Sequence, residues 1–353
     1  MHKYFLFLSL LFIFQLPICF SDFIVADAKL KDENEIKTNF WYENLEYWMT
    51  RLPPKLKRVP IIYLAIPGSH NSMTYTIQKN STIARDKFVG IKRIISFFSK
   101  NPIFNWSVNQ NSNVTDQLNH GIRYLDLRVY ANRSSNEFYF VHGLNGEEIT
   151  EHLQSISDWL DNHQKEIIIL DFQHLYNFNS TIHDVLIRKI NDIFKDKLVP
   201  KTSKMKKLTV QFLNSQNQQV IVIYRDPKVD DHENLWPGNL WPNPWGNTAE
   251  ASELLKFLDD GVTTRNDTVG FVSQIILTAG PMYFVHSREK FLSNLHASLG
   301  GEMEKVSDKW LKKNYPGFGG MNIAITDFVS DRDYKFCKDV IRKNEKIIRP
   351  SKP

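Results

Sequence analysis

Short apolar runs alternate with amphipathic helical segments along this chain, and this alternation constrains the fold more than any other feature. Each run is nearly all apolar, which is typical of strands covered on both faces. The runs are Ile61–Ile66, Ile122–Tyr130, Phe138–His142, Ile167–Gln173, Val220–Tyr224, Gly270–Leu277 and Asn322–Val329. Helical spacing of apolar residues occurs in Ile149–His163, Ile182–Phe194 and Arg288–Asn314. Strands and helices in this order predict a parallel sheet with helices on both faces.

The length of 353 residues allows one large core without disulfide support. No shift in composition and no internal repeat marks a second domain. A dinucleotide-binding sheet is disfavoured because no Gly-x-Gly-x-x-Gly follows the first strand. We therefore expect the α/β class and a single, irregular TIM-type (β/α) barrel over residues 22–353. Its motif core is expected at about 60–175 and its closing strand at about 322–329.

The N-terminal residues 1–21 have the pattern of a secretory signal peptide. His2 and Lys3 precede the apolar run Tyr4–Phe20, and polar Ser21 and Asp22 follow it. An uncleaved signal anchor is the alternative. Glycosylation sequons begin at Asn80, Asn105, Asn113, Asn132, Asn179 and Asn266. Together these features predict a secreted, N-glycosylated protein.

Charge and cysteine content narrow the classes of partner. The formal net charge is +5, and the basic residues are scattered among acids rather than gathered into a stripe. Nucleic-acid binding is therefore disfavoured, and no obligate protein partner is evident. Only Cys19 and Cys337 are present, and Cys19 would leave with the signal peptide. We expect Cys337 to be a small buried hydrophobic residue.

A tryptophan-rich segment, Asn234–Asn247, is punctuated by Pro and Gly and contains Trp236, Trp241 and Trp245. Two interpretations stay open. The indoles could pin a long loop to the barrel, or some of them could line the substrate mouth or enter a membrane interface, as tryptophan commonly does.

Ionisable residues recur at the carboxyl ends of the predicted strands, which is where α/β barrels place catalytic groups. His70 follows the first strand and a Pro-Gly-Ser break. Asp126 and Arg128 lie on one face of the second strand, because side chains alternate along a strand. His142 ends the third strand, and Asp327 lies in the last one.

This set of groups suits phosphoryl transfer. Two imidazoles can act as general base and general acid on opposite sides of a phosphoryl group. An arginine between them can clamp phosphate oxygens and stabilise the charge that develops. An acid behind a histidine fixes its tautomer and raises its basicity. The alternatives are a structural role for His70 and a structural ion pair for Asp126 and Arg128.

The motifs Ile-Pro-Gly-Ser-His70-Asn-Ser, Asp126-Leu-Arg128 and Val-His142-Gly resemble the X region of phosphatidylinositol-specific phospholipases C. The similarity is strongest to the small bacterial-like type, which includes animal proteins made of an X domain alone. It implies an irregular TIM barrel that cleaves phosphatidylinositol-type lipids to diacylglycerol and a (cyclic) inositol phosphate. It also implies that His70 takes the inositol 2-hydroxyl proton and that His142 protonates the diacylglycerol oxygen.

The same resemblance assigns three supporting residues. Arg128 stands where the bacterial enzymes have an arginine and the large animal enzymes have a calcium ligand. Asp126 resembles the acid that orients this arginine, and Asp327 the acid that supports the base. The resemblance therefore implies chemistry without a metal or other cofactor, on a phospholipid at a membrane surface.

Three further positions are carried over as substrate-binding residues. Asn71 stands where the bacterial pattern has Asp, and the calcium-dependent enzymes use Asn there as a metal ligand, so calcium is not fully excluded. Asn71 can accept a hydrogen bond from His142, but without a charge it favours the imidazolium less. Arg225 and Gln274 are expected near the inositol ring.

Two alternatives to this function remain. One is a catalytically weak or silent protein that binds inositol lipids. The other is a metal-dependent phosphodiesterase of the glycerophosphodiesterase or sphingomyelinase D kind. Such enzymes typically place two acids in alternation on one strand, and the pattern Asp126-x-Arg128 disfavours them.

Overall fold

The computed structural model describes residues 42–84, 101–280, 283–284, 289 and 292–348. The predicted signal peptide lies outside this range, so its presence stays a prediction. Residues Trp41–Pro353 form one compact unit. Within the described ranges, no helix combines the length and the apolar character needed to cross a bilayer.

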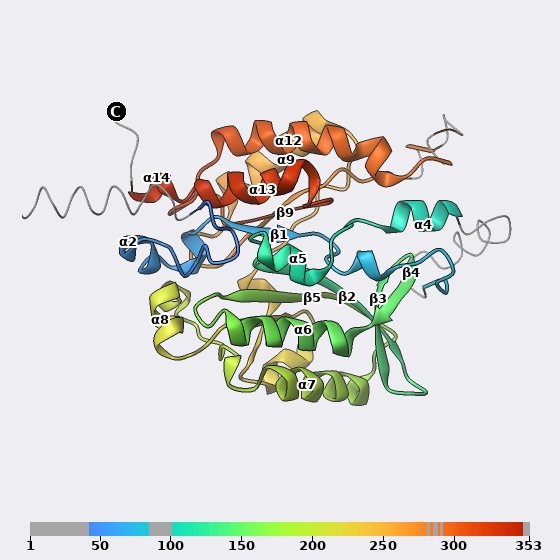
Figure 1. Cartoon of the computed structure of the whole chain (residues 1–353), viewed down its shortest axis with the longest axis horizontal. Coiled ribbons are helices and arrows are strands. Elements are labelled where there is room, and N and C mark those ends of the chain that lie inside the picture. Colours follow the sequence, from blue (N-terminus) through green and yellow to red (C-terminus); the bar gives the residue numbers. More distant parts are fainter. Residues whose placement is uncertain (1–41, 85–100, 281–282, 285–288, 290–291, 349–353) are drawn as a thin grey trace, which may run out of the picture. The chain divides into compact units, whose positions relative to one another are not determined.

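A nine-stranded sheet forms the centre of this unit, in the order β7-β6-β5-β2-β1-β9-β8, with β3 and β4 attached to β2 (Figure 1). Every neighbouring pair on the main path is parallel. The strands are β1 (Ile66–Ser69), β2 (Tyr124–Asn132), β3 (Glu137–His142), β4 (Leu144–Glu148), β5 (Ile168–Tyr176), β6 (Val220–Tyr224), β7 (Leu235–Trp236), β8 (Val272–Ile275) and β9 (Ile323–Thr326). From β1 the order β1-β2-β5-β6-β7 follows the chain, and on the other side of β1 the last strand, β9, pairs with β1 and with β8. The sheet is therefore a TIM-like barrel that is open between β7 and β8.

Residues 240–243 lie along this opening. The backbone N–H groups of Gly270 and Val272 donate to the carbonyls of Leu240 and Pro242 at 3.0 and 2.9 Å. Pro242 and Pro244 carry no N–H and cannot donate in return, so the contact does not become a ladder. The predicted TIM-type barrel is thus confirmed as a parallel, curled half-barrel within a single α/β domain.

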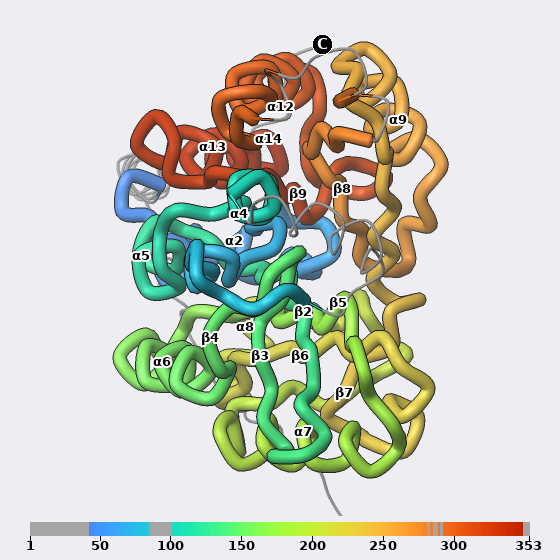
Figure 2. Tube along the Cα trace, turned by 90° about the vertical axis from the view of Figure 1, so that its right-hand side faces the viewer, coloured from blue at the N-terminus to red at the C-terminus, as the bar shows by residue number. Residues whose placement is uncertain are grey.

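Two groups of helices cover the outer face of the curled sheet. Figures 1 and 2 show α9, α12 and α13 beside β8, β9 and β1, and α6 and α7 beside β2, β3 and β5. The helices are α2 (Pro54–Lys57), α4 (Asn101–Ser107), α5 (Val114–Asn119), α6 (Ile149–Asn162), α7 (Ser180–Phe194), α8 (Val210–Ser215), α9 (Ala251–Thr264), α12 (Gly301–Lys313), α13 (Asp331–Arg342) and α14 (Glu345–Ile348). A π-turn, His296–Gly300, precedes α12. The start of the predicted helix Arg288–Asn314 lies outside the described residues, and the rest is helical from Leu295 to Lys313.

The prediction of a first strand at Ile61–Ile66 is wrong, because Ile61–Tyr63 form a 3-10 turn and β1 is Ile66–Ser69. The Pro-Gly-Ser sequence is part of the strand and does not break it. The Pro67 carbonyl accepts a hydrogen bond from the Arg123 N–H on the β2 side. The N–H and C=O of one strand residue point to the same side, so the N–H that Pro67 lacks would also face β2. The β1–β2 register starts only at Gly68, so no ladder bond is lost.

The structure also corrects the role of the third predicted strand. β3 pairs with β2 in antiparallel fashion and continues into β4, so these strands form a hairpin extension and not a βα unit. Few residues separate β2 from β3, and a link that short allows only an antiparallel return. Asn136 takes a positive φ of 57° in this turn.

The burial of Cys337 and of the tryptophans in Asn234–Asn247 tests two of the sequence predictions. Cys337 is fully buried, as predicted, and burial raises the pKa of its thiol. Trp236 and Trp241 are also fully buried and fix their segment to the barrel, whereas Trp245 is 52% exposed. The anchoring interpretation is therefore confirmed for two of the tryptophans.

Gly68 offers a test of the packing at the centre of the sheet. A Cβ atom at this position would lie 2.8 Å from both Ile325 Cγ2 and Tyr124 Cδ1. We expect Gly68→Ala to destabilise the protein by about 1–3 kcal/mol through overpacking, measured by urea unfolding. Gly301→Ala is the matched control, since a Cβ there meets nothing within 4 Å in α12. Equal stability of the Gly68→Ala variant and the wild type would contradict the observed approach of the strands.

Candidate active site

Strand register brings the predicted catalytic residues into one row at the carboxyl edge of the sheet. Ser69 pairs with Thr326 on β9 and with Leu125 on β2, so His70 is level with both Asp327 and Asp126. Asp126 in turn pairs with Asp171 on β5. Three neighbouring strands therefore present ionisable groups beside His70 at the same height.

The contacts of His70 define its tautomer. Its Nδ1 lies 2.6 Å from Asp327 Oδ1, and its Nε2 lies 3.0 Å from Arg128 Nη2. A guanidinium can only donate, so Nε2 accepts and Nδ1 carries the proton that Asp327 binds. This is the tautomer that a general base acting through Nε2 requires.

Asp126 is buried between His70 and Arg128. Its Oδ2 lies 3.5 Å from Arg128 Nη2 and 3.8 Å from His70 Nε2, and it accepts the Asn71 backbone N–H at 3.2 Å. Burial alone would raise the pKa of Asp126, but Arg128, His70 and the Asn71 amide outweigh it and hold the pKa below its usual value. An ionised Asp126 is therefore available to hold Arg128 in place.

His142 approaches the row from the β3–β4 hairpin. Its ring centroid lies 6.5 Å from that of His70, and the two planes meet at 70°. His142 Nδ1 lies 2.9 Å from the Ser107 carbonyl, which can only accept, so this nitrogen carries a proton. The two imidazoles thus lie near one another in an edge-to-face arrangement at the same end of the barrel.

Asn71 does not contact His142 in the way the sequence suggested. Its Nδ2 donates to Asn109 Oδ1 at 3.0 Å, and its Oδ1 is buried without a hydrogen-bond partner in the described chain. Its φ of 44° is positive, a conformation that Asn tolerates better than most residues. The unpartnered oxygen next to Asp126 is an acceptor available to a ligand hydroxyl.

Arg225 follows the carboxyl end of β6 and is paired with Asp171. Its Nε and Nη2 donate to the two oxygens of Asp171 at 2.8 and 2.6 Å, and Nη2 also donates to the Trp241 carbonyl at 2.8 Å. Burial raises the pKa of Asp171, and Arg225 opposes that effect. The bidentate geometry identifies an ion pair, whose guanidinium is partly accessible.

Gln274 belongs to the same polar network. Its Nε2 donates to the Asn243 carbonyl at 3.1 Å, and Asn243 Nδ2 donates to Tyr124 Oη at 3.0 Å. Tyr124 Oη donates in turn to Asp171 Oδ2 at 2.5 Å. Gln274 is nearly buried and connects β8 to the segment that lies along the barrel opening.

The structure adds His174, which the sequence alone did not assign to the site. The β2–β5 register shifts after Leu127, so Arg128 pairs with His174 and Gln173 is passed over. The bulge turns His174 to the same face as Arg128, and its charge lowers the pKa of Asp126. No sequence signal marks this one-residue shift.

Gln110 is a second residue that sequence reasoning missed. Its Nε2 donates to the carbonyls of His70 and Thr326, at 2.9 and 3.0 Å, and its Oε1 accepts the Val329 N–H at 3.1 Å. It therefore fixes the backbone on both sides of the His70–Asp327 pair. A lone glutamine in a loop gives no pattern by which to find it.

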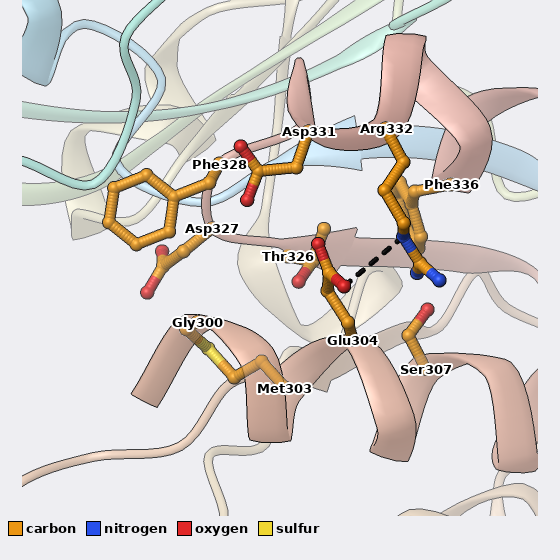
Figure 3. Close-up of a pocket in the computed structure, with 10 residues that line it drawn as sticks. All are labelled: Gly300, Met303, Glu304, Ser307, Thr326, Asp327, Phe328, Asp331, Arg332 and Phe336. Atoms are coloured by element: carbon orange, nitrogen blue, oxygen red, sulfur yellow. Dashed lines mark ion pairs between the residues drawn. The ribbon is translucent and has the colours of Figure 1, made fainter. Parts of the chain in front are cut away.

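A small cavity of about 20 Å³ lies between α12, β9 and the start of α13 (Figure 3). Asp327 lines it, and Asp327 Oδ2 is buried without a hydrogen-bond partner in the described chain. The Arg332–Glu304 ion pair, with N and O 3.2 Å apart, lies beside it. This volume holds about one water molecule, so the cavity is too small for a substrate.

Comparison with known proteins supports the fold and identifies related sequences. A family model described as PI-PLC X 1 matches residues 90–224, which include Asp126, Arg128 and His142. The human PI-PLC X domain-containing protein 3 is 32% identical over 323 residues, covering 90% of this chain and 97% of that protein. The mouse PI-PLC X domain-containing protein 2 is 35% identical over 304 residues, covering 84% and 87%.

Solved structures with the same fold come from bacteria. The phosphatidylinositol-specific phospholipase C of Listeria monocytogenes superposes with a TM-score of 0.57 at 18% identity, covering 85% of this chain and 99% of that one. A point mutant of the Staphylococcus aureus enzyme gives a TM-score of 0.59 at 14% identity, covering 85% and 97%. The architecture is thus the open (β/α) barrel seen in these phospholipases. This chain belongs to the family of PI-PLC X domain-containing proteins.

Proposed function

We propose that this protein is a phosphodiesterase that cleaves phosphatidylinositol-type lipids to diacylglycerol and a cyclic inositol phosphate. The observation that carries the proposal is the pair His70 and His142, with ring centroids 6.5 Å apart and Arg128 bound to His70. The fold comparisons and the family membership support it. No metal takes part in the proposed chemistry.

In the first half of the reaction, His70 Nε2 takes the proton of the inositol 2-hydroxyl. The freed oxygen attacks phosphorus, so a bond forms between O2 and phosphorus. Asp327 binds the Nδ1 proton at 2.6 Å and stabilises the imidazolium that results. Asp327 thereby orients the ring and leaves Nε2 as the nitrogen that accepts a proton.

In the second half, the bond between phosphorus and the diacylglycerol oxygen breaks. His142, in its protonated form, gives a proton to that oxygen, which leaves as the diacylglycerol hydroxyl. The Ser107 carbonyl fixes the orientation of the His142 ring. The product retains a five-membered cyclic phosphate on the inositol.

Arg128 has two partners in succession in this scheme. In the structure its Nη2 donates a hydrogen bond to His70 Nε2. A bound phosphate, which is a stronger acceptor, draws the guanidinium to its own oxygens and exposes Nε2 to the 2-hydroxyl. Asp126 holds the arginine near both positions. Substrate phosphate therefore prepares the base and receives charge stabilisation from the same residue.

The inositol ring is best placed over the inner part of the barrel. Asn71 Oδ1 and Asp126 Oδ1 are buried and unpartnered within the described residues, and both can accept hydroxyl protons. The Arg225–Asp171 pair offers a partly accessible guanidinium beyond them. Gln274 contributes by fixing Asn243 and is a positioning residue in this proposal.

Phosphorus NMR on phosphatidylinositol vesicles tests the proposal, with excess EDTA in one sample and added calcium in another. We expect a cyclic inositol phosphate signal in both samples, because Arg128 supplies the cationic charge. The matched control is the His70→Ala variant, which should give no signal in either sample.

Other outcomes would change the assignment. A signal only with calcium would overturn the arginine-based chemistry and identify Asn71 as part of a metal site. No signal in either sample, with folded protein that still binds the vesicles, would replace catalysis by inositol-lipid binding.

A further inference from the structure

A second cavity lies at the opposite edge of the sheet from the candidate active site. It measures about 470 Å³. Its lining residues are Asp308, Leu311, Lys312, Tyr315, Lys335, Asp339, Arg342, Lys343, Glu345 and Lys346. Asn344, next to Lys343, bonds to the N–H and carbonyl of Ala65 just before β1 begins. The cavity is therefore at the amino ends of the strands, near α14 in Figure 1.

The acids of this cavity are largely matched by cations. Lys335 binds both Asp308 and Asp339, and Arg332 binds Asp308 through two nitrogens. Lys343 and Lys346 differ, since neither forms an ion pair with any carboxylate of the described chain. These two lysines, three residues apart, therefore have no directly paired carboxylate in the described chain, whereas Lys335 beside them has two.

These two lysines converge on one aromatic ring. Their Nζ atoms lie 4.5 and 5.8 Å from the centroid of Tyr315. Burial lowers the pKa of Lys343, Asp339 opposes this, and Lys346 lowers it further. Holding two like charges together in a partly desolvated place costs free energy, and an anion between them would relieve it.

We propose that this cavity is a binding site for a phosphomonoester, held by Lys343 and Lys346 with Lys312 and Arg342 at its rim. A phosphomonoester carries nearly two negative charges and three strong acceptor oxygens. Ammonium groups and an arginine fork match these acceptors. The volume is in the usual range for small-ligand sites, and the Tyr315 ring forms one wall.

The phosphomonoester site does not depend on the proposed catalysis. Only the expectation of where its ligand comes from rests on the proposed function. A membrane that presents lipid to the carboxyl edge does not reach the amino edge. We therefore expect a soluble phosphomonoester, such as an inositol monophosphate. A lipid headgroup is the other source to test, because Phe318, in the same loop as Tyr315, is 72% exposed.

Calorimetric titration with inorganic phosphate and with inositol 1-phosphate tests the site. We expect the Lys343→Gln/Lys346→Gln double variant to bind at least tenfold more weakly than the wild type, with unchanged lipid cleavage. Lys305→Gln is the matched control, an exposed lysine on α12 that does not line the cavity. The same difference is expected in an Arg128→Gln background, which separates this site from anions bound at the active site.

Three results would overturn the proposal: no phosphate binding by the wild type, equal binding by the double variant, or an equal loss in Lys305→Gln. Sedimentation with phosphatidylcholine vesicles, with and without phosphatidylinositol 4-phosphate, distinguishes the sources. Binding to the phosphorylated vesicles that needs Lys343 and Lys346 would support the site and assign it to a lipid headgroup. Should the double variant melt below the wild type, Lys346→Gln alone, at an exposed residue, is expected to weaken binding at least threefold.

Discussion

A His70→Ala variant is expected to cleave phosphatidylinositol about 10²–10⁴ times more slowly than the wild type, the range typical for loss of a general base. The reason is the defined tautomer. Asp327 holds the proton on Nδ1, so Nε2 is the nitrogen that can accept one, and alanine removes it. Initial rates of cyclic inositol phosphate formation, followed by phosphorus NMR, measure the effect.

His142→Ala is expected to lose a comparable factor, because the leaving diacylglycerol oxygen then receives no proton from the protein. The matched control is His232→Ala, because His232 is a half-buried histidine that is not part of the row of candidate catalytic groups. Since His70 is only 7% exposed, circular dichroism melts must accompany the rates. Near wild-type activity of either variant in a native fold would show that the assigned role is wrong.

Replacing Arg128 has the second large effect that we expect. Arg128→Gln should lower the metal-free rate by about 10²–10³, because it removes the cation that faces the developing phosphate charge. Arg128→Asp should lower it further, since it adds a second acid beside Asp126 and repels the phosphate. Steady-state kinetics in EDTA, with kcat and KM determined separately, measure both.

Arg128→Lys is the control for charge. A lysine retains the positive charge but cannot bind two phosphate oxygens with a planar fork. We therefore expect it to recover only part of the rate. Full activity in Arg128→Gln would remove the arginine from the mechanism, and activity of Arg128→Asp that appears only with calcium would identify a latent metal position.

The sequence was sufficient to gather the residues of this row into one candidate site, because each of them lies in an apolar run or shortly after one. His70 and Asp327 are brought level by strand register, and the alternation Asp126-x-Arg128 places both side chains on the inner face. Local pattern determines such positions, so they are predictable from one sequence. Their catalytic roles remain predictions until the variants are measured.

The parts that could not be predicted depend on pairing between distant segments. β3 looks like any barrel strand, and only its pairing with β2 shows that His142 arrives on a hairpin. The bulge that turns His174 inward is a one-residue register shift. The start of β1 was misplaced because proline and glycine usually end strands, whereas here close packing against Tyr124 requires Gly68.

The one-sided contact along residues 240–243 has a consequence for the size of headgroup that this barrel can admit. Elsewhere around the barrel, moving neighbouring strands apart would break parallel ladders whose bonds run in both directions. On this side the prolines leave bonds that run only from Gly270 and Val272 toward Leu240 and Pro242. The least costly direction of expansion is therefore between β7 and β8. In the proposed enzyme, substitutions at residues 240–243 are thus expected to alter the size of substrate admitted and to leave His70 and His142 in place.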